Sequence, residues 1–461
     1  MPANTIESFL KQIKPSINEK THRIYSESLY EHYARTTNSA EKLFKDYDLL
    51  KQRAVFAKTS AINKLEDNLK QFEFAFTKRK GKILWATDAE MATSQIIKIL
   101  QSRGVSSIVK TNSKTFEEIN LREKLLENNI SIEETELNSI YNNIEKQNNP
   151  ISDYTIFSDK IDNVARTLQS NNAFSANTWN DVAEQMKENI AEKCTKSEVC
   201  ITGANFLVSD IGGVVICENE GNVSLSIANT KMQIIIVGVD KMITNIADID
   251  KFMYLLSANT HETLLPHKIN ILTGPRQEGE SQGAEELIVV IIDNGRTDVM
   301  KREKYREAYN CIHCGACNHV CQVYHIIGQD AYKGVDTGPR GNVVNPLIGN
   351  FEEDIAISFA CSMCKKCTDI CPMNIPLHKL ILYNRKEAVD RGENISIKPK
   401  IFSILKKMVS SRKEMDKKYN MFMLKFLSKK TLKDYREYPD FVDKSYNTSI
   451  IQKTKNSDKE I

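Results

Sequence analysis

The chain has 461 residues, of which 41% are hydrophobic, and its formal net charge at pH 7 is +3. This length exceeds one typical domain, so two or three folded domains are expected. No apolar run approaches the ~20 residues that span a bilayer, which excludes a transmembrane helix. A nucleic-acid-binding domain would be strongly basic, and the weak net charge excludes that class of partner as well.

The chain begins with a polar, charged segment and then changes character. Residues 1–75 show helical periodicity between 54 and 74 and no strand signal, so we predict an N-terminal helical region there. From Gly81 onward, short apolar strands alternate with helices. The predicted strands are 83–86, 105–109, 130–135, 154–157, 214–217, 234–237 and 287–292. Such alternation builds a parallel sheet covered by helices, which predicts an α/β domain over residues 76–300.

Polar residues mark helix ends within this domain. Asp88 is a suitable N-cap for the first helix, and Gly104 is placed to end it. Thr115 and Glu118 fit the capping box of the next helix. Glu118, like Glu117, then lies in a first turn, where the helix dipole favours acidic side chains.

The cysteines carry the strongest chemical signal. Eight of the 11 repeat the spacing Cys-x2-Cys-x2-Cys-x3-Cys, and Pro372 follows the second copy. In two-cluster ferredoxins with this spacing, the fourth cysteine of each run ligates the other cluster. We therefore predict two [4Fe–4S] clusters and one-electron transfer. The predicted ligands are Cys311, Cys314, Cys317 and Cys371 for the first cluster, and Cys361, Cys364, Cys367 and Cys321 for the second.

Two other uses of cysteine fit less well. Structural zinc sites usually draw their ligands from separated pairs rather than from runs of four followed by proline. Disulfides need an oxidising compartment, and no signal peptide is seen at the start of the chain. Thiols kept reduced for iron place the protein in the cytoplasm.

The other cysteines and the nearby histidines have simpler interpretations. Cys200 and Cys217 lie in apolar stretches and are expected to be small core residues, and Cys194 shows no ligand spacing. Three histidines near the first run are expected to pack against the site rather than replace a thiol, because each cluster already has four. They are His313, His319 and His325.

Two further segments complete the predicted organisation. Residues 301–395 form the ferredoxin-type domain, which includes an elaborated Gly- and Pro-rich loop of 39 residues between the two runs and a helix over 377–389. Residues 396–461 form a basic tail with 17 Lys and Arg against 8 Asp and Glu. An amphipathic stretch at 401–408 is expected to dock on the protein itself, and an acidic partner subunit is the main alternative.

Several common fingerprints are missing from the sequence. It has no G-x-G-x-x-G after a strand, no P-loop and no G-x-S-x-G elbow. Oxidation of an alcohol or hydroxy acid removes two electrons, whereas a cluster passes one at a time, so a two-electron acceptor would have to come from elsewhere.

Several blocks of sequence closely resemble the lactate-utilisation iron–sulfur protein B family. The blocks are ITGANF at 201–206, DIG at 210–212, ENEGN at 218–222, GPR at 274–276, DNGR at 293–296 and CIHCGAC at 311–317. Lys110, EEI at 117–119, ETEL at 134–137 and REYP at 436–439 are similar to further blocks. Their order and spacing agree from about residue 50 to about residue 445.

This resemblance implies a fold and a function. The fold would be a lactate-utilisation domain like ribose-phosphate isomerases and CoA-transferases, followed by a mainly helical ferredoxin domain with two clusters. The chain would act in the cytoplasm with sister subunits and a redox partner protein to oxidise L-lactate to pyruvate. It would be a redox subunit rather than a complete enzyme.

The chain departs from the family pattern at some positions. Ser152 and Asp159 stand where the family carries two histidines, and Asn138 and Ser139 replace a Gly-Glu pair. Lys114 stands in place of a methionine, and Gln322 in place of a proline. The changes at 138, 139, 152 and 159 affect the ligand site of the α/β domain, so a diverged member with a different or absent substrate is an open alternative.

Polar residues after the strand at 214–217 are the candidate small-molecule contacts. They are Asn219, Glu220 and Asn222, placed where ligands bind in open α/β sheets. The alternative is that Gly221 makes a tight turn and its neighbours satisfy local backbone groups. Asp293 and Arg296 are expected to form a structural ion pair at the hinge to the ferredoxin domain.

Three functions are therefore weighed. The first is a redox subunit of a lactate-oxidising complex, and the second is a general electron-transfer adaptor for another dehydrogenase. The third is an isomerase- or acyl-transferase-like enzyme in which clusters have a regulatory role, and only likeness of fold supports it.

Overall fold

The computed structural model describes residues 41–141 and 178–391, except 138, 262 and 333–335, together with a few isolated positions outside these ranges. The chain divides into two compact units, Met1–Glu393 and Asn394–Ile461. The predicted strand at 154–157, Ser152, Asp159 and the predicted amphipathic stretch of the tail lie outside the described residues. No described helix is long and apolar enough to cross a membrane.

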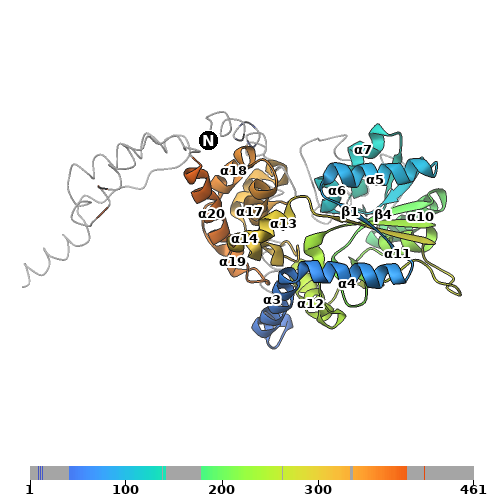
Figure 1. Cartoon of the computed structure of the whole chain (residues 1–461), viewed down its shortest axis with the longest axis horizontal. Coiled ribbons are helices and arrows are strands. Elements are labelled where there is room, and N and C mark those ends of the chain that lie inside the picture. The colour runs from blue at the N-terminus through green and yellow to red at the C-terminus, as the bar shows by residue number, and fades with distance from the viewer. Residues whose placement is uncertain are drawn as a thin grey trace, which may run out of the picture. The chain divides into compact units, whose positions relative to one another are not determined.

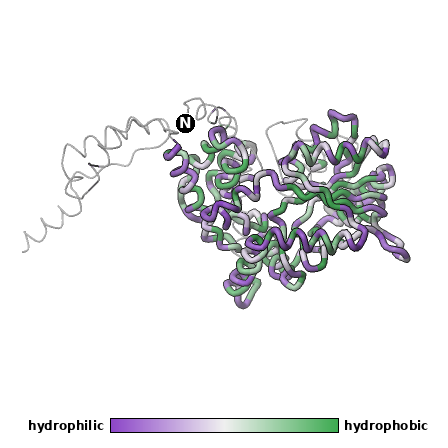
Figure 2. The backbone as a smooth tube through the Cα atoms, viewed as in Figure 1, coloured by the Kyte–Doolittle hydropathy of each residue, from purple (hydrophilic) through white to green (hydrophobic). Residues whose placement is uncertain are grey.

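A six-stranded parallel sheet forms the centre of the α/β part (Figure 1). Its strands, in spatial order, are β1 (Lys82–Ala86), β10 (Glu286–Ile292), β7 (Met232–Gly238), β4 (Val199–Gly203), β2 (Ser107–Lys110) and β3 (Ser131–Glu134). Every residue of β7 is buried, because helices or a second sheet cover both faces. Figure 2 shows these strands as the most hydrophobic segments of the fold. The predicted parallel α/β architecture is confirmed.

Side chains of β7 alternate between two hydrophobic cores. Ile234 and Ile236 belong to the core beneath α5 (Ala89–Ser102), α6 (Lys114–Glu118) and α7 (Leu121–Glu127). Ile235 and Val237 belong to the larger core on the opposite face. A period of two along a strand places neighbours on opposite faces, so one continuous apolar run serves both layers.

Helices before and beside the sheet complete this part. The N-terminal helical prediction is confirmed within the described residues by α3 (Tyr47–Asn63) and α4 (Leu65–Lys78). Among the described residues, the α/β part also contains α10 (Trp179–Lys196), α11 (Asn222–Asn229) and α12 (Ile249–His261). Figure 1 shows α4 on the side of the sheet opposite α5, α6 and α7.

A second, four-stranded sheet corrects one prediction. Its order is β8 (Met242–Ile243), β5 (Phe206–Val208), β6 (Gly213–Glu218) and β9 (Lys268–Leu272). The apolar run at 214–217 therefore does not extend the parallel sheet, and β6 pairs antiparallel with β5 and β9. Only a short turn separates β5 from β6, whereas parallel neighbours need a long crossover.

The predicted helix ends are confirmed for α5 and are wrong for α6. The Asp88 carboxylate accepts a hydrogen bond from the Met91 backbone N–H (2.8 Å), and Gly104 ends the helix with φ +67°, as predicted. The predicted capping box of Thr115 and Glu118 is not formed. Ser113 caps α6 by accepting from the Thr115 N–H, and α6 ends at Glu118 before α7 begins.

The cysteine-rich part is helical, and its connecting segment also corrects the sequence analysis. The segment between the two runs is not the loop that its glycines and prolines predict, because it contains α16 (Gln322–Ile327), α17 (Gly338–Ile348) and α18 (Phe351–Ala360). Pro339 lies in the first turn of α17, where its missing N–H costs nothing, so it starts a helix instead of breaking one. The other helices are α13 (Arg296–Lys301), α14 (Glu303–Arg306), α15 (Ala316–His319), α19 (Lys366–Asp369) and α20 (Leu377–Asp390).

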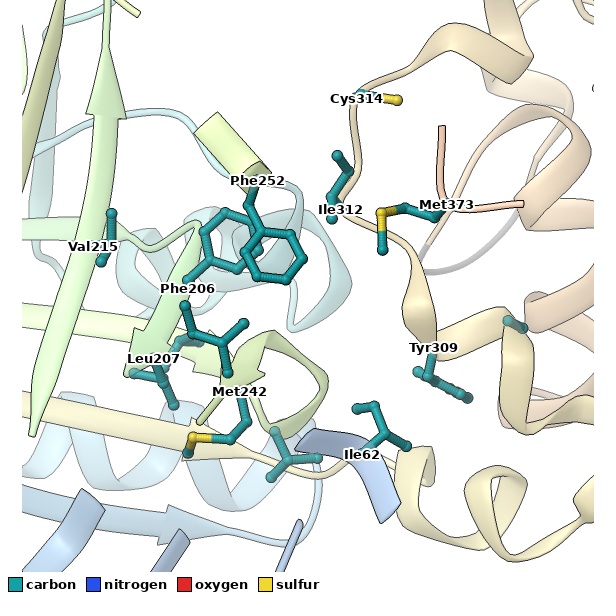
Figure 3. Close-up of a cluster of buried hydrophobic side chains, with 14 of the residues drawn as sticks. Ile62, Phe206, Leu207, Val215, Met242, Phe252, Tyr309, Ile312, Cys314 and Met373 are labelled. Carbon is teal, nitrogen blue, oxygen red and sulfur yellow. The ribbon is translucent and has the colours of Figure 1, made fainter. Parts of the chain in front are cut away.

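One hydrophobic core runs through both parts. Ile312 and Met373 of the cysteine-rich part belong to the same buried cluster as Phe206 and Phe252 of the α/β part. Figure 3 shows Ile312 and Met373 beside each other, next to the Phe252 and Phe206 rings. This shared core fixes the cysteine loops against the α/β part.

Candidate functional site

The two cysteine loops repeat one backbone conformation. Residues two and four after the first cysteine have positive φ in both: His313 (58°) and Gly315 (77°), then Met363 (58°) and Lys365 (69°). A non-glycine residue held in this region costs of order 1–3 kcal/mol. Three such residues at equivalent positions indicate that both loops are bent to surround the same kind of group.

Backbone amides point at the cysteine sulfurs in both loops. The His313 N–H donates to Cys311 Sγ (3.3 Å), and the Met363 N–H donates to Cys361 Sγ (3.4 Å). Hydrogen bonds of this kind stabilise anionic sulfur and help to set the potential of a cluster.

Electrostatic interactions show which cysteines lie near one another. Burial raises the pKa of Cys314, and the neighbouring Cys311 and Cys371 raise it further. Burial also raises the pKa of Cys371 to about 11, and Cys311 contributes to that rise. The last cysteine of the second run thus lies beside the first run.

In the same way, the last cysteine of the first run, Cys321, lies near the second run. Burial raises the pKa of Cys367 to about 12, with further contributions from Cys361 and Cys321. The pKa of Cys321 is raised by burial and then by Cys361 and Cys364. Cys367 also raises the pKa of Cys317, so the two groups of four adjoin.

This donor set fits iron–sulfur clusters. Within the described residues, no three His, Cys, Asp or Glu side chains converge closely enough to hold a single metal ion. A cubane cluster places four iron atoms between its thiolates, so its ligands need not converge on one point. Two neighbouring groups of four thiols are what two such clusters require. Of the remaining cysteines, Cys194 and Cys200 are fully buried in the α/β part.

A buried ionic cluster lies where the strands of the parallel sheet end. Arg296, at the start of α13 after β10, donates from both terminal nitrogens to the Glu118 carboxylate (2.6 Å each). Its Nε donates to Asp240 Oδ1 (2.8 Å) just after β7. These three side chains are only 6%, 1% and 2% exposed. A Cβ at Gly238 would lie 2.4 Å from Asp240 Oδ1, so only glycine permits this approach.

This cluster corrects two expectations from the sequence. Asp293 and Arg296 do not form a side-chain ion pair. The Asp293 carboxylate instead accepts from the Thr297 N–H (2.9 Å), because it lies beside the unpaired backbone donors at the start of α13. Glu118 is at the end of α6 rather than in a first turn, and Arg296 determines its position.

The ionic cluster continues into the first cysteine loop. His313 Nε2 lies 3.5 Å from Asp240 Oδ2, and His313 Nδ1 lies 3.5 Å from Asp336 Oδ1. Arg340 pairs with Asp336 and lies 4.0 Å from Asp240. Burial, together with Lys241 and Arg340, holds the pKa of His313 well below its usual value, so the ring is neutral at pH 7. Despite burial, Arg296 and His313 hold the pKa of Asp240 well below its ordinary range.

Two lysines face the same region. Lys58 of α3 is fully buried and donates to the backbone carbonyls of Asp240 and Met242, the second at 2.9 Å. Burial lowers the pKa of Lys58 to about 7 and that of Lys241 to about 8, and Cys311 opposes both shifts. Cationic groups near Cys311 favour anionic sulfur there.

The residues proposed from sequence to contact a small molecule lie elsewhere. Asn219, Glu220 and Asn222 follow β6 of the second sheet, not a strand of the parallel sheet. Asn219 Oδ1 accepts from the His267 N–H (3.1 Å), and Glu220 Oε2 accepts from the Leu137 N–H (3.1 Å). Both therefore bind backbone groups in this structure.

Sequence reasoning missed the ionic cluster. The missed residues are Lys58, Asp240, Asp336 and Arg340, while Glu118 and Arg296 were given other partners. One signal was available, because Gly238 ends a continuous apolar strand and Asp240 lies just after it, where parallel sheets bind ligands.

Comparison with known proteins agrees with this architecture. The LUD domain family matches residues 69–292, and the 4Fe-4S dicluster domain family matches residues 307–375. Lactate utilization protein B of Bacillus velezensis is 31% identical over 342 residues, which cover 74% of this chain and 72% of that protein. The Anoxybacillus flavithermus protein of the same name is 31% identical over 343 residues, with the same coverage. The uncharacterized electron transport protein YkgF of Escherichia coli is 30% identical over 345 residues, 74% of this chain and 72% of that one.

The fold and the cysteine loops thus define an α/β LUD domain joined to a helical dicluster domain, and that second domain indicates iron–sulfur clusters. The chain belongs to the lactate utilization protein B family.

Proposed function

We propose that this chain is the iron–sulfur electron-transfer subunit of a cytoplasmic complex that oxidises L-lactate to pyruvate. The observation that carries the proposal is that the last cysteine of each run lies near cysteines of the other run, in a chain that also contains a LUD domain. The names of the relatives support the connection with lactate. Sister subunits would supply the two-electron chemistry, because no flavin or nicotinamide fingerprint occurs in the sequence.

Two [4Fe–4S] clusters are part of this proposal. Cys311, Cys314, Cys317 and Cys371 would hold the first cluster, and Cys361, Cys364, Cys367 and Cys321 the second. When bound, the clusters supply one-electron transfer. The protein orients the sulfurs through the two bent loops, and the amides of His313 and Met363 donate to them.

The ionic cluster gives the first cysteine group a fixed orientation toward the α/β part. His313 belongs to the cysteine loop and lies against Asp240, which Arg296 holds at the end of β7. Lys241, and Lys58 in its protonated form, place positive charge near Cys311. Raising positive charge near a cluster favours its reduced, more anionic form, so we infer that these lysines raise the potential of the first cluster.

Analysis of iron and sulfide tests the proposal. The protein purified without oxygen should contain about eight iron atoms and eight sulfides per chain, because each of two cubanes holds four of each. A Cys364→Ser variant should lose one cluster, whereas the matched Cys217→Ser variant should keep both. A colourless protein that contains zinc would overturn the proposal.

A second candidate function is a general electron-transfer adaptor for another dehydrogenase. The departures at 138, 139, 152 and 159 from the family pattern favour it. It uses the same clusters, so metal content does not separate the two. Deletion of the gene in its host does: loss of growth on L-lactate supports the lactate complex, and normal growth without a second copy of the gene supports the adaptor.

A role for Asn219, Glu220 and Asn222 in binding a small molecule belongs to the least supported alternative, an isomerase- or transferase-like enzyme. Glu220→Gln is the direct test, because any activity that depends on this group should fall. Unchanged binding of lactate and pyruvate by that variant would remove these residues from consideration.

A further inference from the structure

The two cysteine groups differ in their access to solvent. Seven of the eight motif cysteines are buried or half-buried, and Cys364 alone among these eight is exposed. The first group adjoins the ionic cluster and the shared hydrophobic core. The group that contains Cys364 is therefore the more accessible of the two to another protein.

Exposed lysines follow this position in the chain and lie on α20, which contacts the same cysteine loop. Lys365 and Lys366 follow Cys364 directly and are exposed, and Lys379 and Lys386 are exposed on α20. The exposed acidic residue of the same loop, Asp369, pairs with Lys365 at 2.9 Å. Four exposed lysines against two exposed aspartates, Asp369 and Asp390 at the end of α20, leave this surface with a net positive charge.

Contacts made by α20 place an apolar side chain within the same surface. His378 Nδ1 lies 2.8 Å from Thr368 Oγ1 of α19, and Arg385 donates to the carbonyl of Cys361. Leu382 is four residues after His378 and three before Arg385, so it lies on the same helix face. Leu382 is 52% exposed although it is a large hydrophobic residue.

We propose that Cys364, Leu382 and the four lysines form the docking surface for an acidic redox partner protein, which exchanges electrons with the second cluster. The inference rests on the proposed function. An apolar anchor within a charged rim is the usual anatomy of a specific interface, and complementary charge speeds the encounter of two proteins. One electron leaves the reduced cluster and reduces the acceptor by one electron.

A second copy of this chain is disfavoured as the occupant of this surface, because a twofold contact would place the same lysines opposite one another. An acidic partner meets no such objection.

Two haem proteins of opposite charge provide the test. The full-length protein with its clusters is reduced without oxygen and mixed with acidic cytochrome b5 or with basic cytochrome c, and haem reduction is followed optically. Lys365→Glu/Lys366→Glu and Lys379→Glu/Lys386→Glu are compared with wild type. The control, Lys98→Glu/Lys187→Glu, makes the same charge change at exposed positions on α5 and α10.

Both test variants should reduce cytochrome b5 about tenfold more slowly than wild type at low salt, with little loss at high salt. Their rates with cytochrome c should not fall, and the control should behave as wild type. The Leu382→Ala variant should reduce cytochrome b5 about threefold more slowly than wild type, even at high salt. Equal rates for test and control variants would overturn the docking surface. Iron and sulfide contents are measured on every variant, and a wild-type protein without clusters would instead overturn the proposed function.

Discussion

The imidazole Nε2 of His313 lies 3.5 Å from Oδ2 of Asp240, so a residue between two cysteines of the first run contacts a carboxylate at the end of β7. Arg296 orients that carboxylate from the other side. The first cysteine loop is thus placed against the edge of the parallel sheet by polar contacts as well as by the shared apolar core. Ligand sites in open α/β sheets occur at this edge.

Replacement of Arg296 should destabilise the protein strongly. Arg296→Met leaves Glu118 and Asp240 buried without their cation, which costs about 3–5 kcal/mol. The matched control is Arg276→Met, which breaks the exposed pair with Glu285 (2.9 Å) and should cost less than about 1 kcal/mol. The free energy of unfolding in urea, measured without oxygen, separates the two. Equal effects would show that the buried network contributes no more than a surface pair.

Ligation across the two runs gives a spectroscopic prediction. Cys371→Ser and Cys311→Ser should remove the same cluster signal in electron paramagnetic resonance, and Cys361→Ser and Cys321→Ser should remove the other. The reason is that the fourth cysteine of each run ligates the cluster of the opposite run. If Cys371→Ser instead removed the signal that Cys361→Ser removes, each run would ligate its own cluster.

Lys58 should make stability depend on pH. Its pKa is lowered by burial to about 7 in the folded protein, from 10.5, so the unfolded chain binds more protons between these values. Stability should therefore rise with pH above about 7, because the burial penalty of the charged amine disappears. Lys58→Met should abolish this rise in the apparent Tm, and Lys70→Met, at an exposed lysine of α4, should keep it. If the apparent Tm of wild type and that of Lys58→Met changed equally between pH 7 and pH 9, the assignment to Lys58 would be contradicted.

Removal of the clusters should loosen the cysteine loops before the sheet. His313, Met363 and Lys365 are held at positive φ, and without the bound groups nothing offsets that strain. After iron is removed by a chelator, limited proteolysis should cut first within 311–321 and 361–371. Strand β7, which is buried along its whole length, and β10, which is buried except at Glu286, should resist cleavage. First cleavage within 232–292 would show that the clusters support the whole fold.

Local patterns in the sequence predicted five of the six strands of the parallel sheet, but not β4 or the second sheet. Because β7 is buried on both faces, its sequence is a continuous apolar run, and such a run can be recognised without a structure. The spacing of the cysteines similarly predicts the iron–sulfur chemistry. The segment 322–360 was misread as a loop because glycine and proline usually interrupt helices, whereas Pro339 occupies a first turn.

The ionic cluster could not be predicted in the same way. Arg296 meets Glu118 and Asp240 across 178 and 56 residues of sequence, so no local pattern links them. The adjacent Asp293 was the obvious partner, but backbone donors at the start of α13 occupy its carboxylate. The partners of a buried charge depend on which strands lie side by side, and that order follows from the whole fold.

The continuous core that joins Ile312 and Met373 to Phe252 limits how this protein can be divided. A fragment that started near residue 300 would expose one half of that core to water, however well its cysteines bound iron. Chimaeras with relatives should therefore exchange both halves of this core together. A substitution in the core of one part should require a compensating substitution in the core of the other part.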